Sequence, residues 1–121
     1  MASEMEKNSN VIASDRVDGT AVYGSDREKI GSVDKVLIDK MGGNVTDVVL
    51  SVGGFLGIGD EKHSIPWARL DYDTDVGGYM LNVTKEQLKD APRFAANEPD
   101  RVYDREYQQG VYDYWDANPT M

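Results

Sequence analysis

Hydrophobic and polar residues follow one another in short runs that predict β-strands. Residues 20–23 form a β-prone run closed by Gly24-Ser25-Asp26, and a longer apolar-rich run extends from Lys29 to Asp39. The apolar positions of the longer run do not keep a single period of two, which predicts a bulge near Asp34-Lys35. In the next predicted strand, Val45–Val52, one face carries Thr46, Val48, Leu50 and Val52.

Turn residues divide the rest of the middle region. Gly42-Gly43-Asn44 supplies the positive-φ positions that a tight hairpin needs. Three further strands are predicted, at residues Lys62–Pro66, Ala68–Tyr72 and Tyr79–Val83. Six short strands without alternating helices predict an all-β fold, a small antiparallel barrel or rolled sheet.

Two helical segments follow the strands. Thr84 and Gln87 have the spacing of a capping box, and Pro92 ends the short helix that they begin. From Arg101 onward, residues four positions apart predict a helix with one apolar face. This face carries Tyr103, Tyr107, Val111 and Trp115, with Tyr114 beside them.

The chain therefore divides into three parts. Residues 1–11 are predicted to be a disordered lead-in, residues 12–94 a barrel domain, and residues 95–121 a partly helical C-terminal extension. A helix this short needs a surface on which to dock. The sequence leaves open whether the extension docks on its own barrel or on another molecule.

Charge and composition exclude several classes of function. The chain has 13 Lys and Arg against 22 Asp and Glu, a net charge of −9, which disfavours direct binding to nucleic acid. It has no cysteine, which excludes disulfides and thiolate metal sites. No apolar stretch approaches the length of a membrane helix or of a secretory signal, so a cytoplasmic protein without membrane insertion is expected.

The middle region resembles the PRC-barrel family, named for the cytoplasmic domain of the photosynthetic reaction centre H subunit. The most specific matching piece is the loop Gly53–Gly59, of sequence Gly-Gly-Phe-Leu-Gly-Ile-Gly. The looser matches are Val22-Tyr23-Gly24, Lys29–Val33, Val36–Asp39, Pro66-Trp67, Leu70-Asp71-Tyr72 and Ala91-Pro92.

The resemblance implies a six-stranded antiparallel barrel that stabilises or docks assemblies, with no catalytic residues and no cofactor. Family members occur in the reaction centre H subunit and in ribosome maturation factors. The expected function is therefore that of a non-enzymatic, protein-binding adaptor. The alternatives are a ribosome-maturation factor that binds a ribosomal protein, an accessory to photosynthetic electron-transfer complexes, and a hydrolase that uses acidic residues.

The glycine-rich loop does not fit either common phosphate-binding spacing, and the acidic Asp60 and Glu61 follow it. Two interpretations remain. In one, its apolar side chains plug one end of the barrel; in the other, they are exposed and anchor a partner. These side chains are Phe55, Leu56 and Ile58.

Other candidate sites have simpler interpretations. Asp71, Asp73 and Asp75 resemble the start of a calcium loop, but Val76 and Asn82 occupy the positions that need Gly and Glu, so a solvated hairpin turn is expected. His63 is the single histidine, and Ser64 beside it points to the opposite face of a strand. Neither pattern predicts a metal site or a catalytic site.

Aromatic residues give the remaining candidates for partner binding, because Tyr and Trp dominate interface hot spots. They are Trp67 and the tail residues Tyr107, Tyr114 and Trp115, together with Val111. A homodimer that uses the tail or an edge strand is the expected assembly.

Overall fold

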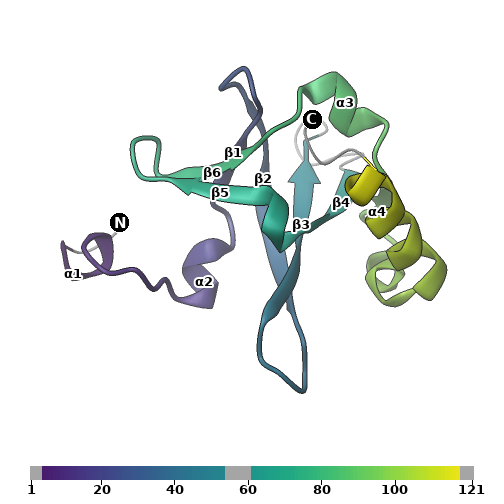
Figure 1. The fold of residues 1–121 in the computed structure, drawn as a ribbon, viewed down its shortest axis with the longest axis horizontal. Helices are drawn as coiled ribbons and strands as arrows, with labels where there is room; N and C mark the ends of the chain where they lie inside the picture. The colour runs from purple at the N-terminus through teal and green to yellow at the C-terminus, as the bar shows by residue number, and fades with distance from the viewer. Residues whose placement is uncertain (1–3, 54–60, 118–121) are drawn as a thin grey trace.

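The computed structural model describes residues 4–53 and 61–117 (Figure 1). Its strands form one sheet in the order β5-β6-β1-β2-β3-β4-β7. The strands are β1 (Ala21–Tyr23), β2 (Lys29–Ile38), β3 (Val45–Val52), β4 (Glu61–Pro66), β5 (Leu70–Asp73), β6 (Gly78–Leu81) and β7 (Phe94–Ala95). The helices are α1 (Glu4–Lys7), α2 (Ser14–Val17), α3 (Lys85–Lys89) and α4 (Arg105–Ala117), with 3-10 turns η2 (Trp67–Arg69) and η3 (Pro99–Tyr103).

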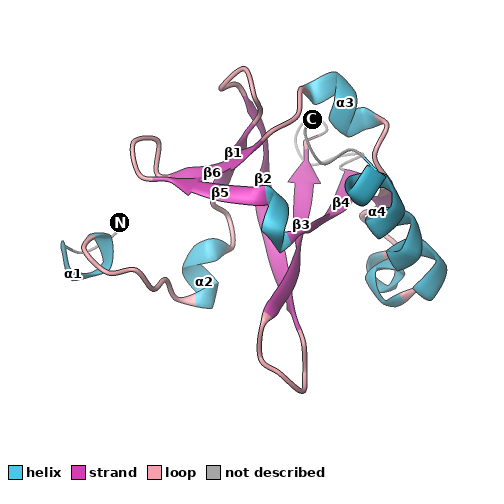
Figure 2. Cartoon of the chain, viewed as in Figure 1, coloured by secondary structure: helices cyan, strands magenta, loops and turns pink. Residues whose placement is uncertain are grey.

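Strand β2 bends the sheet into a barrel-like roll. It pairs with β1 near its start and with β3 along its length, and its register with β3 shifts between Val33 and Lys35, which confirms the predicted bulge. Strands β5 and β6 lie crosswise to β3 (Figure 2). Gly31 lies where β2 crosses β3 closely, because a Cβ atom there would be 2.6 Å from the carbonyl oxygen of Ser51.

The all-β fold is confirmed, with two differences from the sequence-based expectation. Each of the six predicted strands is present, and the two-residue β7 adds a seventh by pairing with β4. The pair of β1 and β6 is parallel, whereas an entirely antiparallel barrel was expected. A parallel pair is possible here because the long segment between β1 and β6 carries the chain back to the same end of the sheet.

The main hydrophobic core fills the inside of the roll. Strands from both of its arms contribute fully buried residues, among them Val22, Leu50, Ile65 and Leu81. Leu88 of α3 and Trp115 of α4 extend this core beyond the sheet. The helix α3 begins with the predicted capping box, in which Thr84 and Gln87 exchange side-chain to backbone hydrogen bonds.

A second, smaller core covers the outer face of β3. Val49, Phe94 and Val102 are buried there, so the segment after α3 folds back over the sheet. Both faces of β3 are therefore buried, whereas its sequence pattern had predicted one buried face. Helix α4 packs beside β4 on this side of the molecule (Figure 1).

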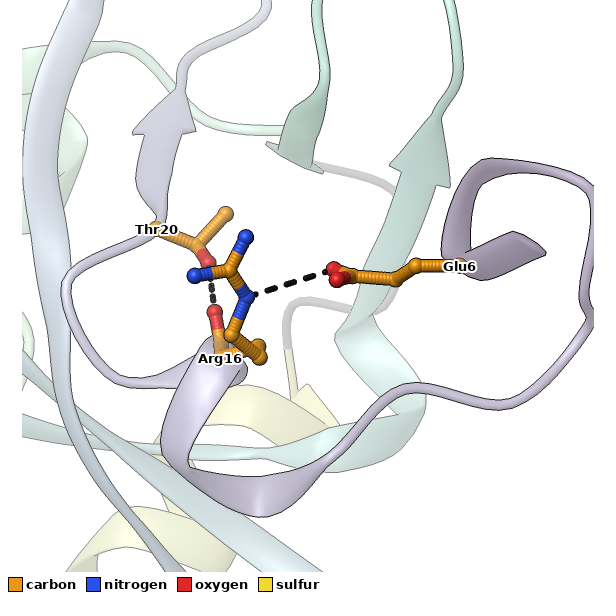
Figure 3. Close-up of polar contacts among 3 residues, drawn as sticks. All are labelled: Glu6, Arg16 and Thr20. Atoms are coloured by element: carbon orange, nitrogen blue, oxygen red, sulfur yellow. Dashed lines mark hydrogen bonds and ion pairs between the residues drawn. The ribbon is translucent and has the colours of Figure 1, made fainter. Parts of the chain in front are cut away.

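The N-terminal segment lies on the other side of the molecule (Figure 1). Arg16 of α2 forms an ion pair with Glu6 of α1, with 3.3 Å between Nε and Oε2, and Thr20 donates a hydrogen bond to the Arg16 carbonyl (Figure 3). The one-turn helix α1 has no buried residue. Among the described residues, no helix is long and apolar enough to cross a membrane.

Candidate protein-binding surface

A groove of about 650 Å³ lies between the β2–β3 hairpin and the C-terminal segment. Val36 and Ile38 of β2 and Asp47 of β3 form one wall. Val102, Tyr103 and Tyr112 of η3 and α4 are among the residues of the opposite wall. We call this cavity the Asp47 groove, because Asp47 is its buried charged residue.

Asp47 is unusual for an acidic residue because it is only 8% exposed. Loss of solvent raises the pKa of its carboxyl, and a hydrogen bond from Thr46 offsets part of that rise. Within the described parts of the chain, no Lys or Arg forms an ion pair with it. Burial also raises the pKa of Tyr112, and the negative charge of Asp47 adds to the rise.

Large apolar side chains are exposed around the Asp47 groove. Ile38 is 52% exposed, Tyr103 72% and Tyr112 48%. Met41, at the tip of the same hairpin, is 95% exposed. Exposed aromatic and aliphatic side chains around a hollow that holds a desolvated charge have the composition of an interface hot spot.

A second hollow of about 380 Å³ lies between the N-terminal segment and the aromatic residues of the β5–β6 hairpin. The Tyr79 ring meets the rings of Trp67 and Tyr72 edge to face, at centroid distances of 5.5 and 5.2 Å. Val11 and Ile12 of the N-terminal segment line this hollow. Trp67, a candidate from the sequence, is thus half-buried against the core.

A third hollow, of about 800 Å³, has mainly polar walls formed by the segment around β7 and by the start of α4. Its cations are already paired. Arg93 lies 3.0 Å from Glu61, and Arg101 lies 3.3 Å from Asp104. Because these charges are already paired and lie near solvent, they offer less to a binding partner than the residues of the Asp47 groove do.

Helix α4 docks on its own barrel, which answers the question that the sequence left open. Val111 is 1% exposed and Trp115 is 2% exposed, and both belong to the main core. Tyr107 is half-buried. Its hydroxyl accepts a hydrogen bond from the Ser64 N–H and donates one to the Pro92 carbonyl, both at 3.2 Å.

Tyr114 is partly exposed and donates a hydrogen bond to the Gln87 carbonyl at 2.9 Å. These contacts tie α4 to β4 and to α3. The remaining candidates, Phe55, Leu56 and Ile58, lie outside the described residues, so their role in partner binding stays a prediction.

The polar candidates lie apart from one another. His63 is 1% exposed, and burial lowers its pKa to about 4. Ser64 opens into the Asp47 groove on the opposite face of β4, as its place in the strand predicted. Asp71 and Asp73 lie in β5 and Asp75 lies in the hairpin turn after it, where Asp73 accepts a hydrogen bond from the Asp75 N–H. No cluster of three or more metal-binding side chains occurs among the described residues.

Sequence reasoning missed Asp47 and Tyr112. Asp47 lies on the face of β3 that was expected to meet solvent, where a charged side chain is ordinary. The sequence feature that could have indicated the burial of Asp47 is Val49, two residues further along the same face. An apolar residue there indicates that another part of the chain covers that face.

Comparison with known proteins identifies the family. The family model described as PRC-barrel domain matches residues 9–88. The chain belongs to the PRC-barrel family. In PRC-barrel terms, the matched region runs from the N-terminal segment through α3, and the segment that carries β7 and α4 follows it.

Two individual matches accompany this PRC-barrel assignment. An uncharacterized protein of Deinococcus radiodurans is 31% identical over 80 residues, which are 66% of this chain and 28% of that protein. The chain therefore spans less than a third of that relative's length. The crystal structure of a 16S ribosomal RNA processing protein, RimM, from Pseudomonas aeruginosa matches with a TM-score of 0.41 and 16% identity. That match covers 65% of this chain and 48% of the other.

Proposed function

We propose that this PRC-barrel domain is a non-enzymatic, protein-binding module, an adaptor whose docking surface is the Asp47 groove. The observation that carries the proposal is the gathering of Ile38, Tyr103 and Tyr112, all about half or more exposed, around one hollow. Covering the exposed part of each such side chain favours association, because it removes apolar surface from water. A surface of this kind is stabilised when a partner covers it.

The arrangement of the polar residues supports a non-catalytic role. His63 lies in the core and stays neutral near pH 7, while Ser64 faces the groove on the other side of the strand. The two side chains therefore do not form a nucleophile and base pair. Asp39 is the other carboxylate among the residues that line the Asp47 groove. It is exposed at the hairpin tip and does not form an acid–base pair with Asp47.

The test is affinity capture from native lysate with the intact chain and with a Tyr103→Ser, Tyr112→Ser double variant. We expect one defined protein to be captured by the intact chain and lost from the double variant. The matched control is Tyr72→Ser, because Tyr72 is 51% exposed and lies outside the groove. Circular dichroism confirms that each variant is folded.

The outcomes separate the candidate surfaces. Loss of capture by Tyr72→Ser alone would place the docking surface at the N-terminal side and contradict the proposal. A Phe55→Ser, Leu56→Ser variant tests the loop candidates in the same way. Capture of small-subunit ribosomal particles, lost in the groove variant, would make the partner ribosomal and the process ribosome maturation.

The predicted homodimer and cytoplasmic location belong to this proposal. Because α4 is docked on its own barrel, a two-fold contact through the buried Val111 and Trp115 would first require that helix to detach. Sedimentation at increasing protein concentration tests the dimer, and a single monomeric species throughout would remove it. Cell fractionation tests the location.

A further inference from the structure

We propose that the Asp47 groove takes a basic side chain, Lys or Arg, from the partner protein, with the Asp47 carboxylate as its counter-ion. This inference rests on the proposed function and specifies the partner's chemistry at the same surface. Three observations support it: the incomplete compensation of the buried Asp47 charge, the side chains that form the walls around Asp47, and the negative net charge of the whole chain.

Asp47 forms no ion pair within residues 4–53 and 61–117. Buried carboxylates in proteins are normally paired, because the protein interior solvates a charge poorly. Asp34 illustrates the usual solution, since its carboxylate lies 3.7 Å from the Lys62 ammonium and 3.9 Å from that of Lys35. Asp47 is more buried than Asp34, yet no Lys or Arg in the part of the chain that the structure describes forms an ion pair with it.

The walls of the Asp47 groove suit a basic side chain in shape and in chemistry. Val36 and Leu37, both half-buried, offer apolar surface that suits the methylene stem of Lys or Arg. The exposed rings of Tyr103 and Tyr112 stand at the rim, where aromatic rings attract a cation as well as its stem. A groove of about 650 Å³ has room for such a side chain together with its neighbours in the partner.

The domain's own Lys40 does not take the place of a partner's cation. Lys40 lines the same groove, at the hairpin tip, but it is exposed and forms no ion pair with Asp47. Asp39 beside it adds a negative charge at the rim. A net charge of −9 over the whole chain favours the approach of a basic segment.

The test uses random short peptides displayed on phage, selected at physiological ionic strength on the intact protein. We expect the selected peptides to share a Lys or Arg beside an apolar residue. Their affinity should fall at least about tenfold with Asp47→Asn and should be unchanged with Asp71→Asn, an exposed residue that loses the same charge. Replacing the peptide's Lys by norleucine removes only the ammonium group and should cause a loss of the same size.

A double-mutant cycle connects the two groups directly. If Asp47 contacts the ammonium, norleucine costs little further affinity once Asp47→Asn has been made. Additive losses, or equal effects of Asp47→Asn and Lys40→Gln, would overturn the inference, because the charge would then act at a distance or through Lys40.

The two proposals fail in different ways. If the selected peptides carry no basic residue and do not bind the Tyr112→Ser variant, this inference is overturned and the docking surface remains in place. Peptides that bind every groove variant equally, or a selection that enriches none, would overturn the proposed function as well.

Discussion

Two buried ionisable side chains lie on the two faces of neighbouring strands, and burial disfavours the charged form of both. For Asp47 the penalty falls on the carboxylate, which is the form that the groove proposal needs for binding. For His63 it falls on the imidazolium, so the folded protein keeps the ring neutral. Asp47 therefore keeps its charge at a cost in folding stability, whereas His63 stays uncharged.

Asp47→Asn should stabilise the folded protein at neutral pH. Burial raises the pKa of the Asp47 carboxyl in the folded state, so its ionisation is less favourable there than in the unfolded chain. The resulting loss of folding stability grows as pH rises through that pKa. Thermal unfolding at pH 7 should show a higher Tm for Asp47→Asn than for the intact chain, by about a few degrees. Asp71→Asn serves as the control.

An unchanged or lower Tm in Asp47→Asn would mean that its carboxylate is well compensated in the free domain. The combination of higher stability with weaker binding is typical of functional residues. Replacing a residue that served only the fold would instead lower the stability of the protein.

His63 predicts an acid-dependent loss of stability. The folded-state pKa of about 4 lies below the ordinary 6.5, so the unfolded chain takes up a proton that the folded chain refuses. Stability is therefore complete above pH 6.5 and falls as pH is lowered towards 4, by up to about 3 kcal/mol at about 1.4 kcal/mol per pH unit.

Urea unfolding of the intact chain and of His63→Leu, at a series of pH values, isolates this effect. The difference in unfolding free energy between the two should change across that window, whatever its absolute value. A constant difference would show that His63 takes up its proton equally readily in the folded and unfolded chains.

At the scale of elements, α4 is an integral part of the barrel. Trp115 is among the fully buried side chains, and Arg69 donates a hydrogen bond to its carbonyl at 3.0 Å. Trp115→Ala should cost about 3–5 kcal/mol, since it removes a large side chain from the main core. Tyr114→Phe, which removes one hydroxyl from the same helix, should cost about 1 kcal/mol or less.

Denaturant unfolding of both α4 variants provides the measurement. Equal small losses would mean that α4 contributes little and that the strands alone form the stable unit. The contrast also distinguishes burial of the helix from the hydrogen bonds at its surface.

The elements differ in how far the sequence predicted them. The strands, the bulge after Val33 and the capping box at Thr84 depend on residues close together in the chain, and all of them are present. The parallel pairing of β1 with β6 depends on residues more than fifty positions apart, and no local pattern carries that information.

The candidate site was less predictable for the same reason. The aromatic spacing predicted the apolar face of α4 through Tyr107, Val111 and Trp115, but it was wrong for Tyr103, which lies in η3 and is 72% exposed. The spacing also did not indicate which surface would cover that face. Tyr112 lies beside that face and becomes part of a groove only because the β2–β3 hairpin stands opposite. Asp47 becomes a buried charge only because the C-terminal segment folds back over β3.

For the whole molecule, the net charge of −9 makes association with a basic partner sensitive to salt. The attraction acts over about 30 Å at 0.01 M ionic strength but over only about 8 Å at 0.15 M. The association rate constant for a selected basic peptide should therefore fall by about tenfold or more over this range.

Stopped-flow fluorescence with the intact chain and Asp47→Asn separates the long-range field from the contact. The variant keeps nearly all of the net charge, so its association rate should show almost the same salt dependence. Its loss of affinity should appear mainly as faster dissociation, because the missing interaction is the short-range one in the groove. A slower association with unchanged dissociation would instead assign Asp47 to the general field of the domain, and the groove would then be a hydrophobic contact without a counter-ion.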